Sequence, residues 1–109
     1  MRELRSYETE NGRAPFEEWK NKLDRSIQFR LTAYLNRLLI GAAKNNTKSL
    51  GDGVFELKLN IGPGYRVYFG EDGEQIILLL LGGDKQSQFR DIIKAKGYWR
   101  NYNETFKKI

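Results

Sequence analysis

The stretch Gly62–Lys85, GPGYRVYFGEDGEQIILLLLGGDK, carries most of the information about the fold of this chain. It opens with a Gly-Pro-Gly turn, continues as a strand that contains Arg66, and turns again at Asp72-Gly73. An Asp-Gly pair between two strand patterns is a strong signal for a β-hairpin. Six consecutive Ile or Leu residues from Ile76 then predict a central strand that is covered on both faces.

The residues on either side of this stretch predict further strands and helices. We expect a first strand over residues 2–8, a helix that begins at Pro15, and a second helix from a Ser26 cap to about Gly41. Residues 42–53, AAKNNTKSLGDG, read as a polar loop. Asp84 can cap a final helix, which Gly97 ends or kinks.

These elements predict the α+β class, in the order βααβββα, with a small antiparallel sheet packed against an N-terminal helical pair and a C-terminal helix. A chain of 109 residues is long enough for one hydrophobic core and too short for two. We therefore expect a single domain over residues 1–109.

Strand periodicity places four chemically active side chains on one face of the sheet. Glu56 and Lys58 alternate with apolar residues on one strand, as Arg66 and Tyr68 do on the next. If the two strands pair across the Gly-Pro-Gly turn, all four side chains project from the same side, and Lys85 leaves the adjacent strand end nearby. A partly solvated face with ordinary cross-strand ion pairs remains open as an alternative.

Composition limits the chemistry that this site can use. The chain has no cysteine and no histidine, which removes thiol catalysis, disulfides and the usual side chain for acid–base catalysis near neutral pH. Any catalysis must therefore rest on Lys, Arg, Tyr, Glu or Asp.

Charge points to a polyanion or to an acidic protein as the partner. The net charge is +5, and residues 25–50 carry five basic side chains and no acidic one. A merely solvated basic helix face is the alternative. No apolar run approaches the roughly 20 residues of a membrane span, and the first residues, MRELRSYE, lack the apolar core of a signal peptide. The default expectation is a cytoplasmic protein without a membrane partner.

The segments GDGVFELKLNIGPGYRVYFG and ILLLLGGDKQSQFRDIIKAKGYW resemble the RelE/ParE toxin superfamily, and more narrowly its HigB-like addiction module killer proteins. The resemblance implies a RelE-like fold and the toxin of a type II toxin–antitoxin system. Such toxins are metal-independent endoribonucleases (mRNA interferases) that use no cofactor and inhibit translation. They cut messenger RNA on the ribosome by attack of the 2′-hydroxyl on the adjacent phosphorus.

The resemblance also assigns residues. Arg66 matches the strand arginine of the family, Lys58 one of its paired basic residues, and Lys85 the basic residue after the last strand. Glu56 stands where RelE-type relatives have a second lysine, and Asp91 stands about where they have a catalytic tyrosine. The catalytic set is thus Arg66, Lys58, Lys85 and Glu56, with Tyr68 or Tyr98 as a substitute phenol where one is needed.

Partners follow from the same resemblance. A helix-turn-helix antitoxin is expected to bind the toxin, and the complex to bind operator DNA. The residues that we expect to contact RNA are Arg30, Arg37, Lys48, Gln88, Arg90 and Tyr98. A ParE-like inhibitor of DNA gyrase, and a nucleic-acid-binding module without catalysis, are the competing interpretations.

Overall fold

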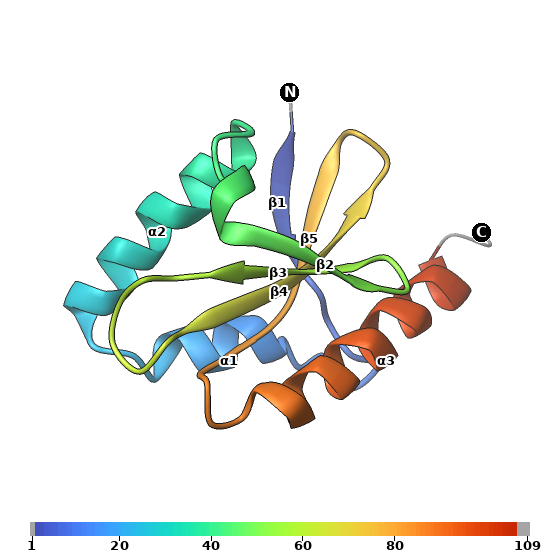
Figure 1. Cartoon of the computed structure of the whole chain (residues 1–109). Helices are drawn as coiled ribbons and strands as arrows, with labels where there is room; N and C mark the ends of the chain where they lie inside the picture. Colours follow the sequence, from blue (N-terminus) through green and yellow to red (C-terminus); the bar gives the residue numbers. More distant parts are fainter. Residues whose placement is uncertain (1, 107–109) are drawn as a thin grey trace.

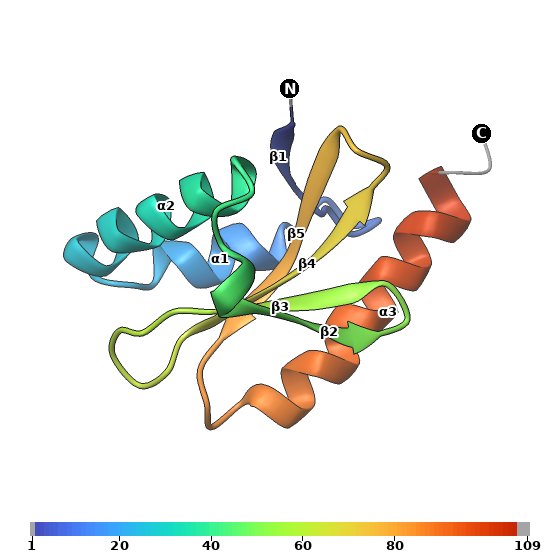
Figure 2. The same ribbon diagram turned by 45° about the horizontal axis from the view of Figure 1, so that its top comes forward.

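The computed structural model describes residues 2–106 as one five-stranded sheet with helices on both faces (Figures 1 and 2). The elements are β1 (Glu3–Ser6), α1 (Pro15–Asn21), α2 (Arg25–Leu39), a 3₁₀ turn (Lys44–Asn46), β2 (Thr47–Gly51), β3 (Val54–Lys58), β4 (Arg66–Asp72), β5 (Ile76–Gly83) and α3 (Gln88–Phe106). The strand order is β1-β5-β4-β3-β2. Strands β2 to β5 pair antiparallel, whereas β1 pairs parallel with β5.

The predicted α+β class is confirmed, with two differences in the sheet. The sheet, predicted as antiparallel, is mixed, because β1 runs parallel to β5 at one end of it. The prediction of a polar loop over residues 42–53 is wrong, because this segment contains the strand β2.

Strand β2 forms a hairpin with β3 through Asp52-Gly53. Asp52 has φ 56° and Gly53 has φ 83°, the left-handed backbone that a tight two-residue hairpin turn requires. The strand reads as a loop because it lies at the edge of the sheet, where Lys48 and Ser49 are exposed. Its polar composition is therefore a property of an edge strand.

The apolar run of β5 lies inside the sheet, between β1 and β4, as predicted. Ile77 and Leu79 join the core on the side of α1 and α2, whereas Leu78 and Leu80 join the core on the side of α3. The two faces of this strand thus tie both helical layers to one sheet.

Helix α2 covers one face of the sheet through Leu31, Leu35 and Leu38. Asp24 occupies its cap position, so the expected Ser26 cap is wrong, and the helix ends at Leu39.

Helix α3 covers the other face and continues through Gly97, which does not end it. In the turn before α3, the backbone N–H of Ser87 donates to the Asp84 carboxylate at 3.1 Å, and that of Asp84 donates to the Ser87 hydroxyl at 3.2 Å. Helix α3 begins at Gln88, so Ser87 directly precedes it, and the prediction that Asp84 caps the helix is wrong: Asp84 closes the turn before it. No helix between residues 2 and 106 is both long and apolar enough to cross a membrane.

Two glycines give a matched test of this packing. A Cβ built on Gly70 would lie 2.3 Å from Cε3 of Trp99, so Gly70→Ala should destabilise the protein by about 1–3 kcal/mol through overpacking. Gly97 lies within α3 and has no neighbour within 4 Å of a built Cβ, so Gly97→Ala should stabilise it by about 0.5–1 kcal/mol. Urea unfolding of both variants measures the two effects. Equal stability of Gly70→Ala and the wild type would show that Trp99 does not pack on this strand as described.

Candidate functional site

Polar side chains of β3 and β4 lie next to each other on the sheet face that α3 covers. Lys58 pairs directly with Arg66, and Glu56 pairs with Tyr68. The predicted register is therefore confirmed, and the four residues share one face. On the far side of Glu56, the edge strand β2 adds Lys48 as a direct cross-strand neighbour.

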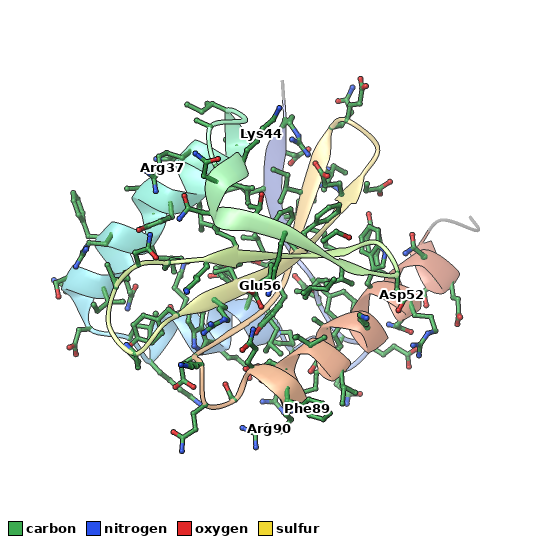
Figure 3. All side chains as sticks on the ribbon, viewed as in Figure 1. Arg37, Lys44, Asp52, Glu56, Phe89 and Arg90 are labelled. Carbon is green, nitrogen blue, oxygen red and sulfur yellow. The ribbon has the colours of Figure 1, made fainter. Side chains whose placement is uncertain are left out.

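Glu56 is the centre of this group and is only 3% exposed. Gln88 donates a hydrogen bond of 2.9 Å from Nε2 to its Oε2. The other oxygen, Oε1, lies 3.7 Å from Nε of Arg66 and 3.9 Å from Nζ of Lys48. In Figure 3, Glu56 lies above the first turn of α3, whereas Arg90 projects away from it. A buried carboxylate needs such partners, because an unpaired charge away from water is strongly destabilising.

Arg66 is held tightly from two sides. Its Nη1 donates a 2.6 Å hydrogen bond to the carbonyl of Gly64, which the Gly-Pro-Gly turn brings back toward the strand with φ 75°. Its Nε is buried beside Glu56 without a hydrogen-bond acceptor. Among residues 2–106, no acceptor engages Nη2, so the two N–H groups of this nitrogen remain available to a phosphate.

Tyr68 is buried too deeply to contact a substrate directly, which its expected catalytic role would require. Its side chain is 0% exposed, and its hydroxyl has no hydrogen-bond partner among the described residues. Burial raises the pKa of the phenol well above its ordinary value, and the charges of Glu56 and Asp91 raise it further. Tyr68 is therefore a neutral buried group that does not reach a substrate in this conformation, which corrects the expectation of direct catalysis.

A surface pocket of about 360 Å³ opens beside this group. Lys48, Lys58 and Arg66 line it together with Glu56, and the remaining lining residues are Asn45, Asn46, Thr47 and Asn60. Three cations and several neutral donors around one carboxylate can bind a phosphate group and leave an oxygen base next to it. We call this the Arg66 pocket.

Lys85 lies near the Arg66 pocket but does not line it. Its backbone N–H donates to the carbonyl of Pro63 at 3.4 Å, and its Cβ packs against Gly64 on the side where Nη1 of Arg66 lies. The Lys85 side chain is exposed, so it can reach an anion bound near Arg66.

The six residues expected to contact RNA do not form one surface. Lys48 and Gln88 belong to the Arg66 pocket or to its supporting contacts, and Arg90 is exposed on the first turn of α3. Arg30 and Arg37, in contrast, lie on α2, which covers the opposite face of the sheet. The thickness of the sheet thus separates them from the Arg66 pocket.

Tyr98 and Arg37 make contacts of their own elsewhere. The Tyr98 ring stacks on Tyr7 with centroids 5.1 Å apart, and it does not line the Arg66 pocket. The guanidinium carbon of Arg37 lies 4.5 Å from the centre of the Tyr34 ring. Arg37 and Tyr98 therefore lie outside the Arg66 pocket, and their contact with RNA stays a prediction.

Asp91 is a second buried carboxylate beside the site. It is 6% exposed and accepts a 2.5 Å hydrogen bond from the Ser87 hydroxyl. Gly83, the cross-strand partner of Arg66, makes room for it, because a Cβ there would lie 1.9 Å from the Asp91 carboxylate. The Gly-Gly pair that ends the apolar strand was the available sequence signal for this close approach.

The described residues contain no cluster of three acidic side chains that could hold a metal ion. Oxygen ligands from Glu56 and Asp91 lie in the same part of the fold but are engaged by Gln88 and Ser87. The side chains of the Arg66 pocket can therefore bind an anion next to the Glu56 carboxylate.

Comparison with known proteins gives a relative without an assigned activity. A protein of Haemophilus influenzae, described as "Uncharacterized protein", is 39% identical over 82 residues, which are 74% of this chain and 82% of the relative. No family model matches the chain.

Two tyrosines test the position of Tyr68. Tyr68→Phe removes a buried hydroxyl without a partner, so it should leave stability unchanged or raise it by about 1 kcal/mol. Tyr7→Phe removes the acceptor of a 2.6 Å hydrogen bond from Asn101 and should cost about 1 kcal/mol. Denaturant unfolding of both variants decides between these outcomes. A clear loss of stability in Tyr68→Phe would mean that the hydroxyl has a partner in solution.

Proposed function

The chain belongs to the same family as the Haemophilus influenzae protein, and from the site that it carries we propose that it is the toxin of a type II toxin–antitoxin system. In this proposal it is a metal-independent endoribonuclease of the RelE/ParE superfamily that cuts messenger RNA on the ribosome. The observation that carries the proposal is the convergence of Lys48, Lys58 and Arg66 around Glu56 in one pocket. The resemblance of the strand and turn motifs to HigB-like toxins supports it.

The proposed reaction needs no group beyond the RNA and these side chains. The 2′-oxygen of one nucleotide loses its proton and attacks the adjacent phosphorus, and the bond from phosphorus to the 5′-oxygen breaks. The products are a 2′,3′-cyclic phosphate and a 5′-hydroxyl, which takes up a proton. Charge on the five-coordinate phosphorus grows during this step, so fixed cations around it lower the barrier.

The pocket distributes these tasks among its residues. Glu56 is the candidate base, because its carboxylate lines the pocket between two cations. Nη2 of Arg66 contacts a phosphate oxygen, and Lys58 neutralises charge from the exposed side and is the candidate proton donor. Lys85 adds charge near the Gly64 turn, and Lys48 orients Glu56.

The partners in this proposal are those of the toxin class. A helix-turn-helix antitoxin binds the chain and the complex binds operator DNA, and the toxin acts in the cytoplasm, where translation takes place. Substrate positioning by the ribosome supplies much of the rate, because the site contains no histidine.

Charge-altering variants in a bacterial host without the antitoxin test the proposal. Lys58→Gln removes a cation, and Arg66→Lys keeps the charge but loses the planar guanidinium, so each should reduce transcript cleavage by about 10²-fold or more. Arg30→Gln removes an exposed cation from α2, the helix on the opposite face of the sheet; it is the control for loss of charge and should retain cleavage and growth arrest. Mapping of transcript ends after brief induction is the measurement.

Two further results discriminate the alternatives. An RNA with a 2′-deoxy nucleotide at the cut site should resist cleavage, because the attacking oxygen is missing. Intact transcripts together with gyrase-dependent DNA breaks would contradict the nuclease proposal and favour a gyrase inhibitor. Intact transcripts, intact DNA and normal growth would contradict the toxin proposal as a whole.

A further inference from the structure

A second pocket, of about 350 Å³, lies between α1, α3 and the end of β5. It shares no lining residue with the Arg66 pocket. The residues that give it chemical character are Arg13, Glu18, Trp19, Lys22, Lys94 and Tyr98. None of them has a part in the proposed cleavage reaction. We call this the Trp19 pocket.

Two aromatic rings in the Trp19 pocket are fixed by the core of the protein. The Trp19 ring lies against Gly82, where a built Cβ would approach its Cε3 to 2.1 Å. The Tyr98 ring stacks on Tyr7 at an interplanar angle of 26°. Both rings are partly buried and also line the pocket. Rings that are already immobile lose little conformational entropy when a planar ligand stacks on them.

Two ammonium groups in the same pocket are free. Lys22 and Lys94 are exposed, and neither has a hydrogen-bonded or salt-bridged partner within residues 2–106. Arg13, in contrast, is already engaged by Glu18 through contacts of 3.0 and 2.6 Å. Glu18 also attracts Lys22 electrostatically. Three cations against one carboxylate still leave an excess of two positive charges next to the rings, and the two ammonium groups, which form no ion pair, bind phosphate readily as point charges.

The Trp19 pocket also offers polar groups at its wall. The Tyr98 phenol, whose pKa burial raises, stays protonated at neutral pH and can donate a hydrogen bond. The Glu18 carboxylate can accept one from a sugar hydroxyl or from an exocyclic amine. Such groups orient a ligand whose ring and charge are recognised elsewhere in the pocket.

We propose that the Trp19 pocket binds a nucleotide, with its base against Trp19 and Tyr98 and its phosphate at Lys22 and Lys94. The volume lies within the roughly 300–1,000 Å³ of small-molecule sites. A bare phosphate would leave the rings unused, and a neutral apolar ligand would leave two cations facing it. The nucleotide is a free mononucleotide or one unit of a single-stranded RNA, and the proposal holds whether or not the chain cleaves RNA.

Calorimetric titration of the full chain at low salt tests the ligand. Adenosine 5′-monophosphate should bind, whereas ribose 5-phosphate and adenosine should each bind at least about tenfold more weakly, since each lacks one of the two recognised parts. If the nucleotide and ribose 5-phosphate bound with equal affinity, the proposed stacking of the base on Trp19 and Tyr98 would be overturned. Absence of binding by both the nucleotide and the RNA used below would overturn the proposal.

Paired variants locate the site. The double variant Lys22→Gln and Lys94→Gln should weaken nucleotide binding by about tenfold or more. The double variant Arg25→Gln and Lys44→Gln removes the same charge from exposed positions that line neither the Trp19 pocket nor the Arg66 pocket, and it should leave nucleotide binding within about twofold of wild type. Equal losses in the two double variants would overturn the proposal in favour of general charge attraction. Thermal unfolding of both variants confirms that they are folded.

An uncleavable RNA tetranucleotide, with 2′-O-methyl groups throughout, identifies the source of the nucleotide. Binding at least about tenfold tighter than the mononucleotide, and lost in the Lys22 and Lys94 variant, assigns the pocket to an RNA strand. Binding equal to or weaker than that of the mononucleotide, with the same dependence on Lys22 and Lys94, assigns it to a free nucleotide. The proposal is overturned if the mononucleotide does not bind and the RNA binds equally well to the wild type and to the Lys22 and Lys94 double variant.

Discussion

The ion pair between Glu56 and Arg66 is the constraint on which the sheet face under α3 depends. Both residues are more than nine-tenths buried, with the carboxylate oxygen 3.7 Å from Nε of the guanidinium. Removing one member of such a pair leaves an uncompensated charge away from water and typically costs about 3–5 kcal/mol. The element that covers this end of the face must therefore be polar, and α3 meets the requirement by placing Gln88 on Glu56.

The same requirement divides α3 into two halves. Near its start, Ser87, Gln88 and Asp91 form hydrogen bonds over the polar end of the sheet face. Further along, Ala95 and Trp99 pack on the apolar end of that face, where Gly70 gives the indole room. Hydrophobic burial thus anchors the helix at a distance from the Arg66 pocket, and the pocket wall is built by polar contacts.

Sequence periodicity was sufficient for the central part of the fold and for the shared face of the candidate site. Alternation of apolar and polar residues in β3 and β4 determines which side chains face α3, because a strand has a period of two. The edge strand β2 escaped prediction because its exposed residues look like a loop, although Asp52-Gly53 carried the hairpin signal. The depth at which each side chain is buried could not be predicted from the sequence either. Arg66 and Tyr68 occupy equivalent positions in the strand alternation, but their burial depends on how α3 and the Gly64 turn cover them.

The strand that escaped prediction changes how the candidate site is organised. In a loop, Lys48 would be a mobile surface cation with no fixed relation to Glu56. In β2, pairing with β3 places it directly beside Glu56, so the carboxylate lies between one buried and one exposed cation.

The buried cation, Arg66, contributes rigidity, because its guanidinium is held by Gly64 and Glu56 before any ligand arrives. The exposed cations Lys48 and Lys58 face solvent and attract an anion from a distance. This attraction extends over the screening length, which is roughly 8–10 Å at moderate salt. Attraction and fixed geometry thus come from different residues, and the hairpin of β2 and β3 brings them together in one pocket.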